Sequence, residues 1–205
     1  METTDDNVMK TPTEKENEAL LLIFKEFDSC YNANSISKKL GITPRGSLKV
    51  LDSLFSEKIL VGRKLGKAVF YKVNFENNYA KKLIETLLIK ESMEKASRWL
   101  SEFEGLFGVA QIVLVYGSAV KTYEQARDID LIVVIEKSRY KEASKNIEKK
   151  NGILLKPVHP LLMTLSDLEK NLKTKNPAMM NALKEGYVLH GQEKMVEVVK
   201  NVTSF

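Results

Sequence analysis

The sequence predicts a mixed α+β / α/β chain in two parts joined by helix, and three observations carry this prediction. Apolar residues first recur at helical spacing and are then followed by two short basic segments around Gly66. A long helical pattern comes next, and after it two β-branched runs flank a polar spacer, as in a pair of buried strands. The expected organisation is a flexible tail (1–13), an N-terminal domain (14–76), a helical linker (77–107) and a C-terminal α/β domain (108–205).

The composition excludes several classes of protein. Of 205 residues, 43% are hydrophobic and 29% are charged, which is an ordinary balance for a globular protein. No apolar run approaches the roughly 20 residues of a membrane helix, and the acidic, polar N-terminus is unlike a secretory signal. Cys30 is the only cysteine, so no internal disulfide forms and a reducing cytoplasm is the expected location.

Positive charge is concentrated near the N-terminus. The formal net charge is +5, and the segment 31–74 holds nine lysines and arginines against only Asp52 and Glu57. This excess predicts a polyanionic partner.

Residues 14–56 predict three helices. The first has apolar residues at spacings of three and four from Leu20 to Phe27, and a short second helix, 35–40, stops at Gly41. Thr43 and Pro44 favour the start of the third helix, because threonine caps a helix and proline fits its first position. In that helix we expect one buried stripe, formed by Leu48, Leu51, Leu54 and Phe55.

A basic hairpin is expected next, with strands at 61–64 and 68–73 around a turn at Gly66. This order of elements resembles the winged helix-turn-helix domains of prokaryotic transcription regulators. The resemblance implies a double-stranded DNA partner, with Arg45, Ser47 and Lys49 near the bases and Arg63, Lys64 and Lys67 near the phosphates. The alternative is a dimerisation or protein-docking module whose lysines are solvated surface.

The linker, 77–107, predicts one long helix or two shorter ones. We expect Trp99 to be a packing anchor rather than a base-stacking platform, because apolar residues surround it in the pattern. The linker could also pair two chains into a homodimer.

The stretch 111–136 contains the residue types of a metal and phosphate site. Gly117 and Ser118 follow the first apolar run, and Asp128 and Asp130 begin the second. Alternate residues of a strand point to the same side, so the two carboxylates repel unless a cation lies between them. Oxygen ligands of this kind suit Mg²⁺, with phosphate and water completing its coordination.

This order of residues resembles the minimal nucleotidyltransferases of the DNA polymerase beta superfamily. The resemblance implies that Gly117 and Ser118 hold a nucleoside triphosphate and that Asp128 and Asp130 hold Mg²⁺. Lys121 stands near the position where many members carry arginine, and it would offset phosphate charge as a point charge.

Two positions depart from the family pattern. Arg127 stands where serine is frequent, and it could steady the carboxylates or compete with a metal for them. The third strand, expected at 153–164, lacks the third carboxylate of active members, and His159 occupies its neighbourhood. A histidine there could act as a base, or it could simply stack at an edge strand between two prolines.

The remaining pattern predicts helices at 138–150, at 178–184 and at 192–202, with a short strand at 185–191. A further helix is expected after Ser166, whose spacing to Glu169 is that of a capping box.

Two functions follow from these expectations. The first is a nucleotidyltransferase with a DNA-binding winged helix, which transfers a nucleoside monophosphate from a Mg²⁺-bound triphosphate to an unidentified acceptor. The alternative is a DNA-binding transcriptional regulator whose nucleotidyltransferase-like domain is weakly active or inactive and serves nucleotide sensing or dimerisation.

Overall fold

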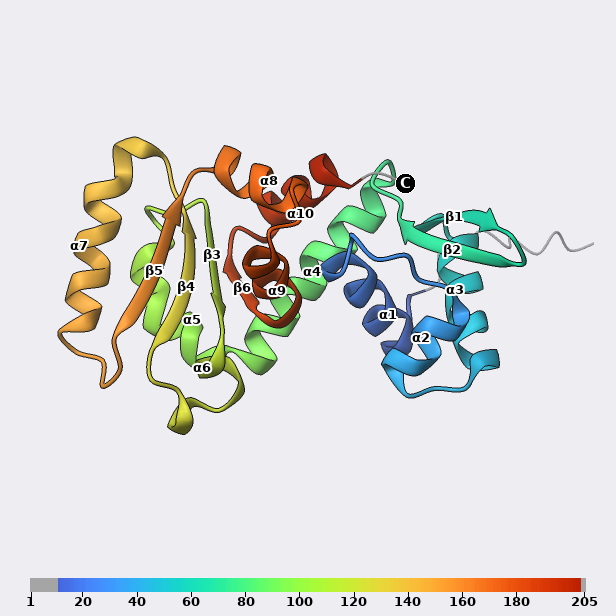
Figure 1. Ribbon diagram of the computed structural model, residues 1–205, viewed down its shortest axis with the longest axis horizontal. Helices are drawn as coiled ribbons and strands as arrows, with labels where there is room; N and C mark the ends of the chain where they lie inside the picture. Colours follow the sequence, from blue (N-terminus) through green and yellow to red (C-terminus); the bar gives the residue numbers. More distant parts are fainter. Residues whose placement is uncertain (1–10, 204–205) are drawn as a thin grey trace, which may run out of the picture.

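The computed structural model describes residues 11–203 and shows a mixed α+β chain with two separate sheets (Figure 1). Residues 1–10 and 204–205, which include most of the expected tail, lie outside the described residues. The longer helices are α1 (Glu14–Lys25), α2 (Ala33–Leu40), α3 (Pro44–Ser56), α4 (Asn78–Lys95), α5 (Ser97–Phe103), α7 (Tyr140–Asn151), α8 (Leu165–Lys173), α9 (Pro177–Glu185) and α10 (Gln192–Val202). The strands are β1 (Leu60–Leu65), β2 (Ala68–Val73), β3 (Ile112–Tyr116), β4 (Ile129–Val134), β5 (Val158–Met163) and β6 (Tyr187–His190). The short helical turns are α6 (Ser118–Lys121), η1 (Glu104–Leu106), η2 (Tyr123–Gln125) and η3 (Lys137–Arg139).

The N-terminal elements follow the order of a winged helix: three helices and then the hairpin β1–β2. A single bridge from Tyr31 to Tyr71 adds the segment between α1 and α2 to the edge of the hairpin. Gly41 ends α2 in the left-handed conformation, and the Thr43 side chain caps α3 by accepting from the Gly46 N–H at 3.1 Å. We call these elements, from α1 to β2, the winged helix.

The buried face of α3 differs from the expected stripe. Leu51 and Leu54 are buried as expected, whereas Leu48 and Phe55 are 46% and 48% exposed. Ser47 takes the buried position instead, because a small side chain allows α3 to approach α2 closely.

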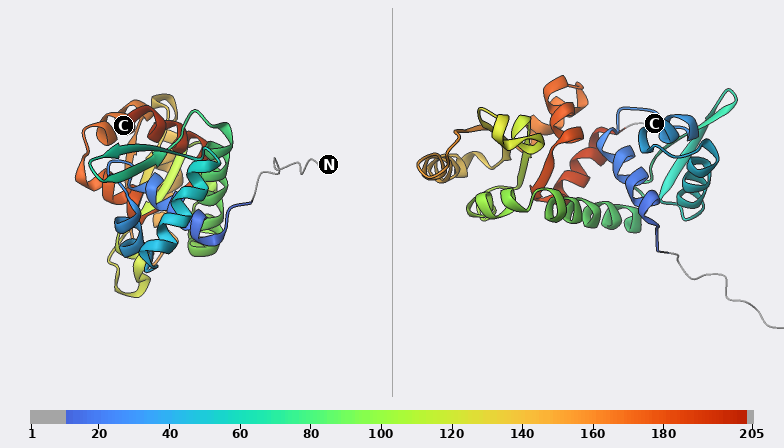
Figure 2. Two further views of the ribbon diagram at one scale, coloured as in Figure 1. Left: turned by 90° about the vertical axis from the view of Figure 1, so that its right-hand side faces the viewer. Right: turned by 90° about the horizontal axis from the view of Figure 1, so that it is seen from below.

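The linker forms two helices, α4 and α5, which separate at Ala96. They run along one side of the molecule from the winged helix to the sheet (Figure 2). Trp99 on α5 is 4% exposed and stacks on Phe103, so it packs inside the protein as expected.

The C-terminal sheet has the order β5-β4-β3-β6, in which β4 and β5 are parallel and the other pairs are antiparallel. Side chains alternate between its two faces. Val113, Val115, Leu131 and Val133 share a core with α5 and α7. Ile112, Leu114, Ile132 and Val134 share the other core with α8, α9 and α10. We call this sheet with its flanking helices the C-terminal domain.

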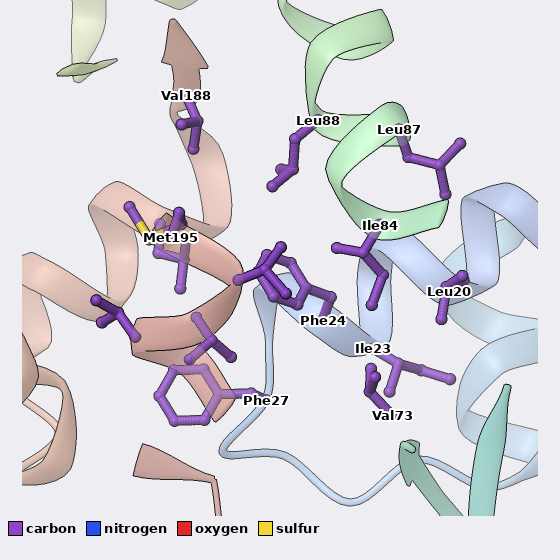
Figure 3. Close-up of a cluster of buried hydrophobic side chains, with 14 of the residues drawn as sticks. Leu20, Ile23, Phe24, Phe27, Val73, Ile84, Leu87, Leu88, Val188 and Met195 are labelled. Atoms are coloured by element: carbon purple, nitrogen blue, oxygen red, sulfur yellow. The ribbon is translucent and has the colours of Figure 1, made fainter. Parts of the chain in front are cut away.

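The core that the sheet shares with α8, α9 and α10 extends into the winged helix. Phe24 and Ile23 of α1 lie in the same buried cluster as Ile84 of α4, Val188 of β6 and Met195 of α10 (Figure 3). The expected boundaries at residues 76 and 107 stay predictions, but the hydrophobic core extends across both positions.

Two elements of the C-terminal domain begin at other residues than expected. The helix α8 is capped by Thr164, which forms a capping box with Asp167, and not by Ser166 with Glu169. The third strand of the motif is shorter than expected, because β5 begins only at Val158. Pro160 lies within it, at the edge of the sheet, where a missing N–H is tolerated.

Candidate metal and nucleic-acid sites

Gly117 forms a sharp bend directly after β3. Its φ of +82° lies in the region that favours glycine, and an added Cβ would overlap the carboxylate of Asp130. The glycine therefore allows an acidic side chain to lie directly against the backbone of the bend.

Asp128 and Asp130 lie on either side of the buried Ile129 at the start of β4. Asp130 is opposite Tyr116 on β3 and opposite His159 on β5. The Nδ1 atom of His159 is 3.1 Å from Oδ2 of Asp128, and one ligand atom from each of Asp128, Asp130 and His159 lies within 4.8 Å of the others. Two neighbouring strands, β4 and β5, thus bring three potential metal ligands to one end of the sheet, near α6 in Figure 1.

The electrostatics of this cluster favour a cation. Burial raises the pKa of Asp130, the charge of Asp128 raises it further, and His159 opposes the change. Burial also raises the pKa of the neighbouring Tyr116, with Asp130 and Asp128 adding to the effect. A bound cation would relieve the repulsion between the carboxylates.

The three side chains fit a divalent cation. A cation about 2.1 Å from two adjacent ligands sets those ligands about 3 Å apart, close to the observed distance from His159 to Asp128. The His159 and Asp128 side chains are 62% and 30% exposed, so the cluster is open to water and to a phosphate ligand. Asp128, Asp130 and His159 would hold the cation, which would supply charge neutralisation for a polyphosphate.

The other residues expected to bind nucleotide lie differently. Ser118 is exposed at the start of α6, directly after Gly117. The Lys121 ammonium lies 2.5 Å from the Glu185 carboxylate at the end of α9, and this hydrogen bond lowers the pKa of Glu185. Sequence analysis did not single out Glu185, and no local pattern marks it as a partner of Lys121.

The spacer between the motif strands is held from two sides. The Lys156 ammonium donates to the carbonyl oxygens of Tyr123, Glu124 and Ala126. The Arg98 guanidinium lies 3.6 Å from the centre of the Tyr123 ring. Arg127 is exposed, and the group that lies beside the Asp128 carboxylate is the His159 imidazole, with Nδ1 at 3.1 Å from Oδ2. Lys156 thus fixes the segment that leads into Asp128, a role that its sequence position did not indicate.

A second candidate site lies on α3 and the hairpin. Five of the six residues expected to contact DNA are exposed there: Arg45, Lys49, Arg63, Lys64 and Lys67. A groove between α3 and the hairpin is lined by Leu48, Asp52, Lys67, Val69 and Tyr71, among others.

Ser47 is the sixth expected DNA-contacting residue, and it is not on this surface. Its side chain is fully buried, and its hydroxyl donates to the carbonyl oxygens of Ala33 at 2.6 Å and Pro44 at 2.9 Å. Because the Ser47 side chain is buried and its hydroxyl donates to carbonyl oxygens inside the protein, it cannot reach a base.

The two faces of the hairpin differ. Gly62 lies opposite Tyr71, Lys64 lies opposite Val69, and a Cβ at Gly62 would meet Phe55 of α3 at 3.3 Å. Because side chains alternate, Lys64 is on the face that turns toward α3, whereas Arg63 is on the other face. The cations of the hairpin are therefore spread over both its sides.

Within residues 11–203, none of the helices combines the length and the apolarity that crossing a bilayer requires. No protein-family model matches the chain, and no curated protein matches it. Among solved structures, the chain is similar to the adhesin competence repressor of Streptococcus pyogenes, with 19% identity and a TM-score of 0.34. The alignment covers 44% of this chain and 67% of the repressor. A likeness at this level carries no conclusion about family or function.

Proposed function

We propose that this protein is a DNA-binding regulator whose winged helix binds duplex DNA and whose C-terminal domain binds a metal–nucleotide complex. The observation that carries the first part is the set of exposed cations on the two elements that a winged helix presents to a duplex, α3 and the hairpin.

The positions of these cations suggest different contacts. Arg45 is in the first turn of α3, the part of a recognition helix that contacts base edges, and Lys49 lies one turn further on. Arg63, Lys64 and Lys67 are on the hairpin, where they would pair with phosphates and set the orientation of the protein.

Fluorescence anisotropy with labelled duplex DNA over a series of salt concentrations tests this part. Each lost phosphate contact lowers the salt slope of log K by about 0.9, so a double substitution of Arg63 and Lys64 by alanine should lower it by roughly 1.8. The matched control replaces Lys141 and Lys145, exposed on α7 at the other end of the molecule (Figure 1), and should leave the slope unchanged. Equal losses in both variants, or an affinity that ignores salt, would argue against the proposed surface.

The second part of the proposal rests on four residues that lie close together at one end of the sheet: Gly117, Asp128, Asp130 and His159. The exposed Ser118 beside the bend could donate to a phosphate, and a divalent cation on the carboxylates would neutralise the charge of a triphosphate. Support also comes from the resemblance of this motif to the minimal nucleotidyltransferases.

Calorimetry with ATP, CTP, GTP or UTP, with and without a divalent cation, tests nucleotide binding. Affinity should require the cation and should disappear when Asp128 and Asp130 are both replaced by asparagine. Asp52→Asn, which removes a carboxylate from α3, is the control and should bind nucleotide as the wild type does. Cation-independent binding would contradict the proposed site.

Nucleotidyl transfer is the second candidate function, and the contact between the Gly117 bend and Asp130 favours it. In such a reaction an acceptor hydroxyl attacks the α-phosphorus of the triphosphate, and pyrophosphate leaves. Transfer of an α-phosphate label to an acceptor, lost on substitution of Asp128 and Asp130 by alanine, would support it; transfer that survives the substitution would rule the assignment out.

A further inference from the structure

We infer that His159 is a third metal ligand and that the site therefore prefers a first-row transition dication, such as Mn²⁺ or Co²⁺, to Mg²⁺. The inference rests on the proposed function, because it assumes that Asp128 and Asp130 bind a cation. It replaces the Mg²⁺ expected from the sequence by a cation that accepts nitrogen.

The first step of the argument is the position of the imidazole. Nδ1 of His159 is 3.1 Å from Oδ2 of Asp128, which is the spacing of adjacent ligands on one small cation. The backbone of His159 lies opposite Asp130 in the parallel pair β4–β5. The imidazole thus lies close to both of the carboxylates already proposed as ligands, with one ligand atom of each within 4.8 Å of the others.

The second step is that the backbone holds this arrangement in place. A hydrogen bond of 2.9 Å from the Ile129 N–H to the Pro157 carbonyl joins the two strands beside the cluster. His159 precedes Pro160, and a residue before proline is confined to extended conformations. The backbone of His159 is therefore already fixed, and metal binding would cost only the rotamer freedom of its side chain.

The third step is the chemistry of the ligand set. Mg²⁺ favours oxygen ligands alone and keeps several waters, whereas transition dications accept imidazole nitrogen readily. Cys30, the only cysteine, is exposed in the winged helix and supplies no thiolate to this cluster. For two carboxylates and one imidazole, affinity should rise in the order Mg²⁺, Mn²⁺, Co²⁺.

The test uses the full chain and the metal salts alone, without nucleotide. Calorimetry should show tighter binding of Mn²⁺ than of Mg²⁺ to the wild type. Pulsed electron paramagnetic resonance of bound Mn²⁺ should show modulation from a directly bound ¹⁴N nucleus. The sequence has only two histidines, so this signal can come from His159 or His190 alone.

Three variants assign the signal. His159→Ala should weaken Mn²⁺ binding by at least about tenfold. Loss of a residue that only hydrogen-bonds to a metal ligand already costs about that much, and His159 would be a ligand itself. His159→Asp should lose the ¹⁴N signal and bind Mg²⁺ more tightly, because it restores an all-oxygen site. His190→Asn, in β6 and stacked on Phe107, is the control and should keep both the signal and the preference.

Two results would overturn the inference, and they differ in what else they affect. In the first, Mn²⁺ binding lacks the ¹⁴N signal and tolerates His159→Ala, but it disappears when Asp128 and Asp130 are replaced by asparagine. This result would refute the role of His159 and leave the proposed carboxylate site intact. Mn²⁺ binding that tolerates the substitution of both aspartates would refute the metal site itself, and the inference with it. Circular dichroism of each variant confirms that the fold is retained.

Discussion

The Lys25 ammonium lies 2.8 Å from the Glu91 carboxylate and 2.8 Å from the carbonyl oxygen of Gly186. One buried cation thus joins α1 of the winged helix to α4 and to the residue before β6. Burial lowers the pKa of Lys25, and the nearby charge of Glu91 opposes this effect. The pair is 7% and 10% exposed, so solvent screens it little.

Removing one member of this pair should destabilise the protein strongly. Lys25→Met leaves the Glu91 carboxylate buried without its counter-charge, which typically costs about 3–5 kcal/mol. Lys15→Met, which removes an exposed partner of Glu18, should cost no more than about 1 kcal/mol. Urea unfolding of both variants measures the difference, and equal midpoints would contradict the importance of the buried pair.

Gly117→Ala should damage the metal site more than it damages the fold. The added methyl group would overlap the Asp130 carboxylate and displace it, and the combination of φ +82° with ψ −157°, which is open essentially to glycine alone, costs about 1–3 kcal/mol in addition. Gly66→Ala separates these effects, because Gly66 has a φ of +61° but open space around its Cβ position. Calorimetry with Mn²⁺ should show weaker binding only for Gly117→Ala, and urea unfolding should show a larger loss of stability for Gly117→Ala than for Gly66→Ala, whose methyl group would meet no neighbouring atom. Unchanged binding by Gly117→Ala would show that Asp130 need not lie against the bend.

Glu26 should make the protein sensitive to acid. Burial acts to raise its pKa, but hydrogen bonds from Tyr31 at 2.5 Å and Lys39 at 3.0 Å outweigh it, and the pKa is lowered from 4.5. A lowered folded-state pKa gives stability that is present above the unfolded-state value and is lost as the pH falls through the folded-state value. Between about pH 6 and about pH 3, the wild type should therefore lose more unfolding free energy than Glu26→Gln does. Parallel curves for the two proteins would exclude this contribution, and the exposed Glu94→Gln serves as the control.

Asp52→Asn should strengthen DNA binding. Asp52 is exposed in the groove between α3 and the hairpin, where its charge would repel phosphates. Its hydrogen bond from the Tyr71 hydroxyl is long, at 3.4 Å, so little stability is at stake. The loss of about 1 kcal/mol of repulsion corresponds to roughly fivefold tighter binding. Anisotropy titration should show this gain for Asp52→Asn and not for Glu148→Gln on α7; weaker binding would place Asp52 in a specific contact with the duplex.

Sequence reasoning succeeded for the fold where the signals are local. The start of α3 at Thr43 and Pro44 depends on capping, whereas the limits of α10, which has no side-chain cap, and the mixed α and β class depend on periodicity. The buried face of α3 was predicted less well, because Ser47 is buried by its fit against α2, which no pattern within α3 encodes. The cap of α8 was ambiguous, since Thr164 and Ser166 both precede an acidic residue by three positions.

The same limit applies to the candidate site. The nearness of Gly117 to Asp130 follows from the pairing of two adjacent strands, so the sequence could predict it. The pairs Lys121 with Glu185 and Lys156 with the spacer carbonyls join residues far apart in the chain, and only the folded structure brings them together. The roles of these residues in binding stay predictions.

The cluster that unites Phe24 of α1 with Val188 of β6 has a consequence for the energetics of ligand binding. A hydrophobic core shared by the winged helix and the C-terminal domain should make the two parts unfold together, as one cooperative unit. By mass action, a ligand bound at the sheet would then raise the melting temperature of the winged helix, and a bound duplex would protect the sheet from proteolysis.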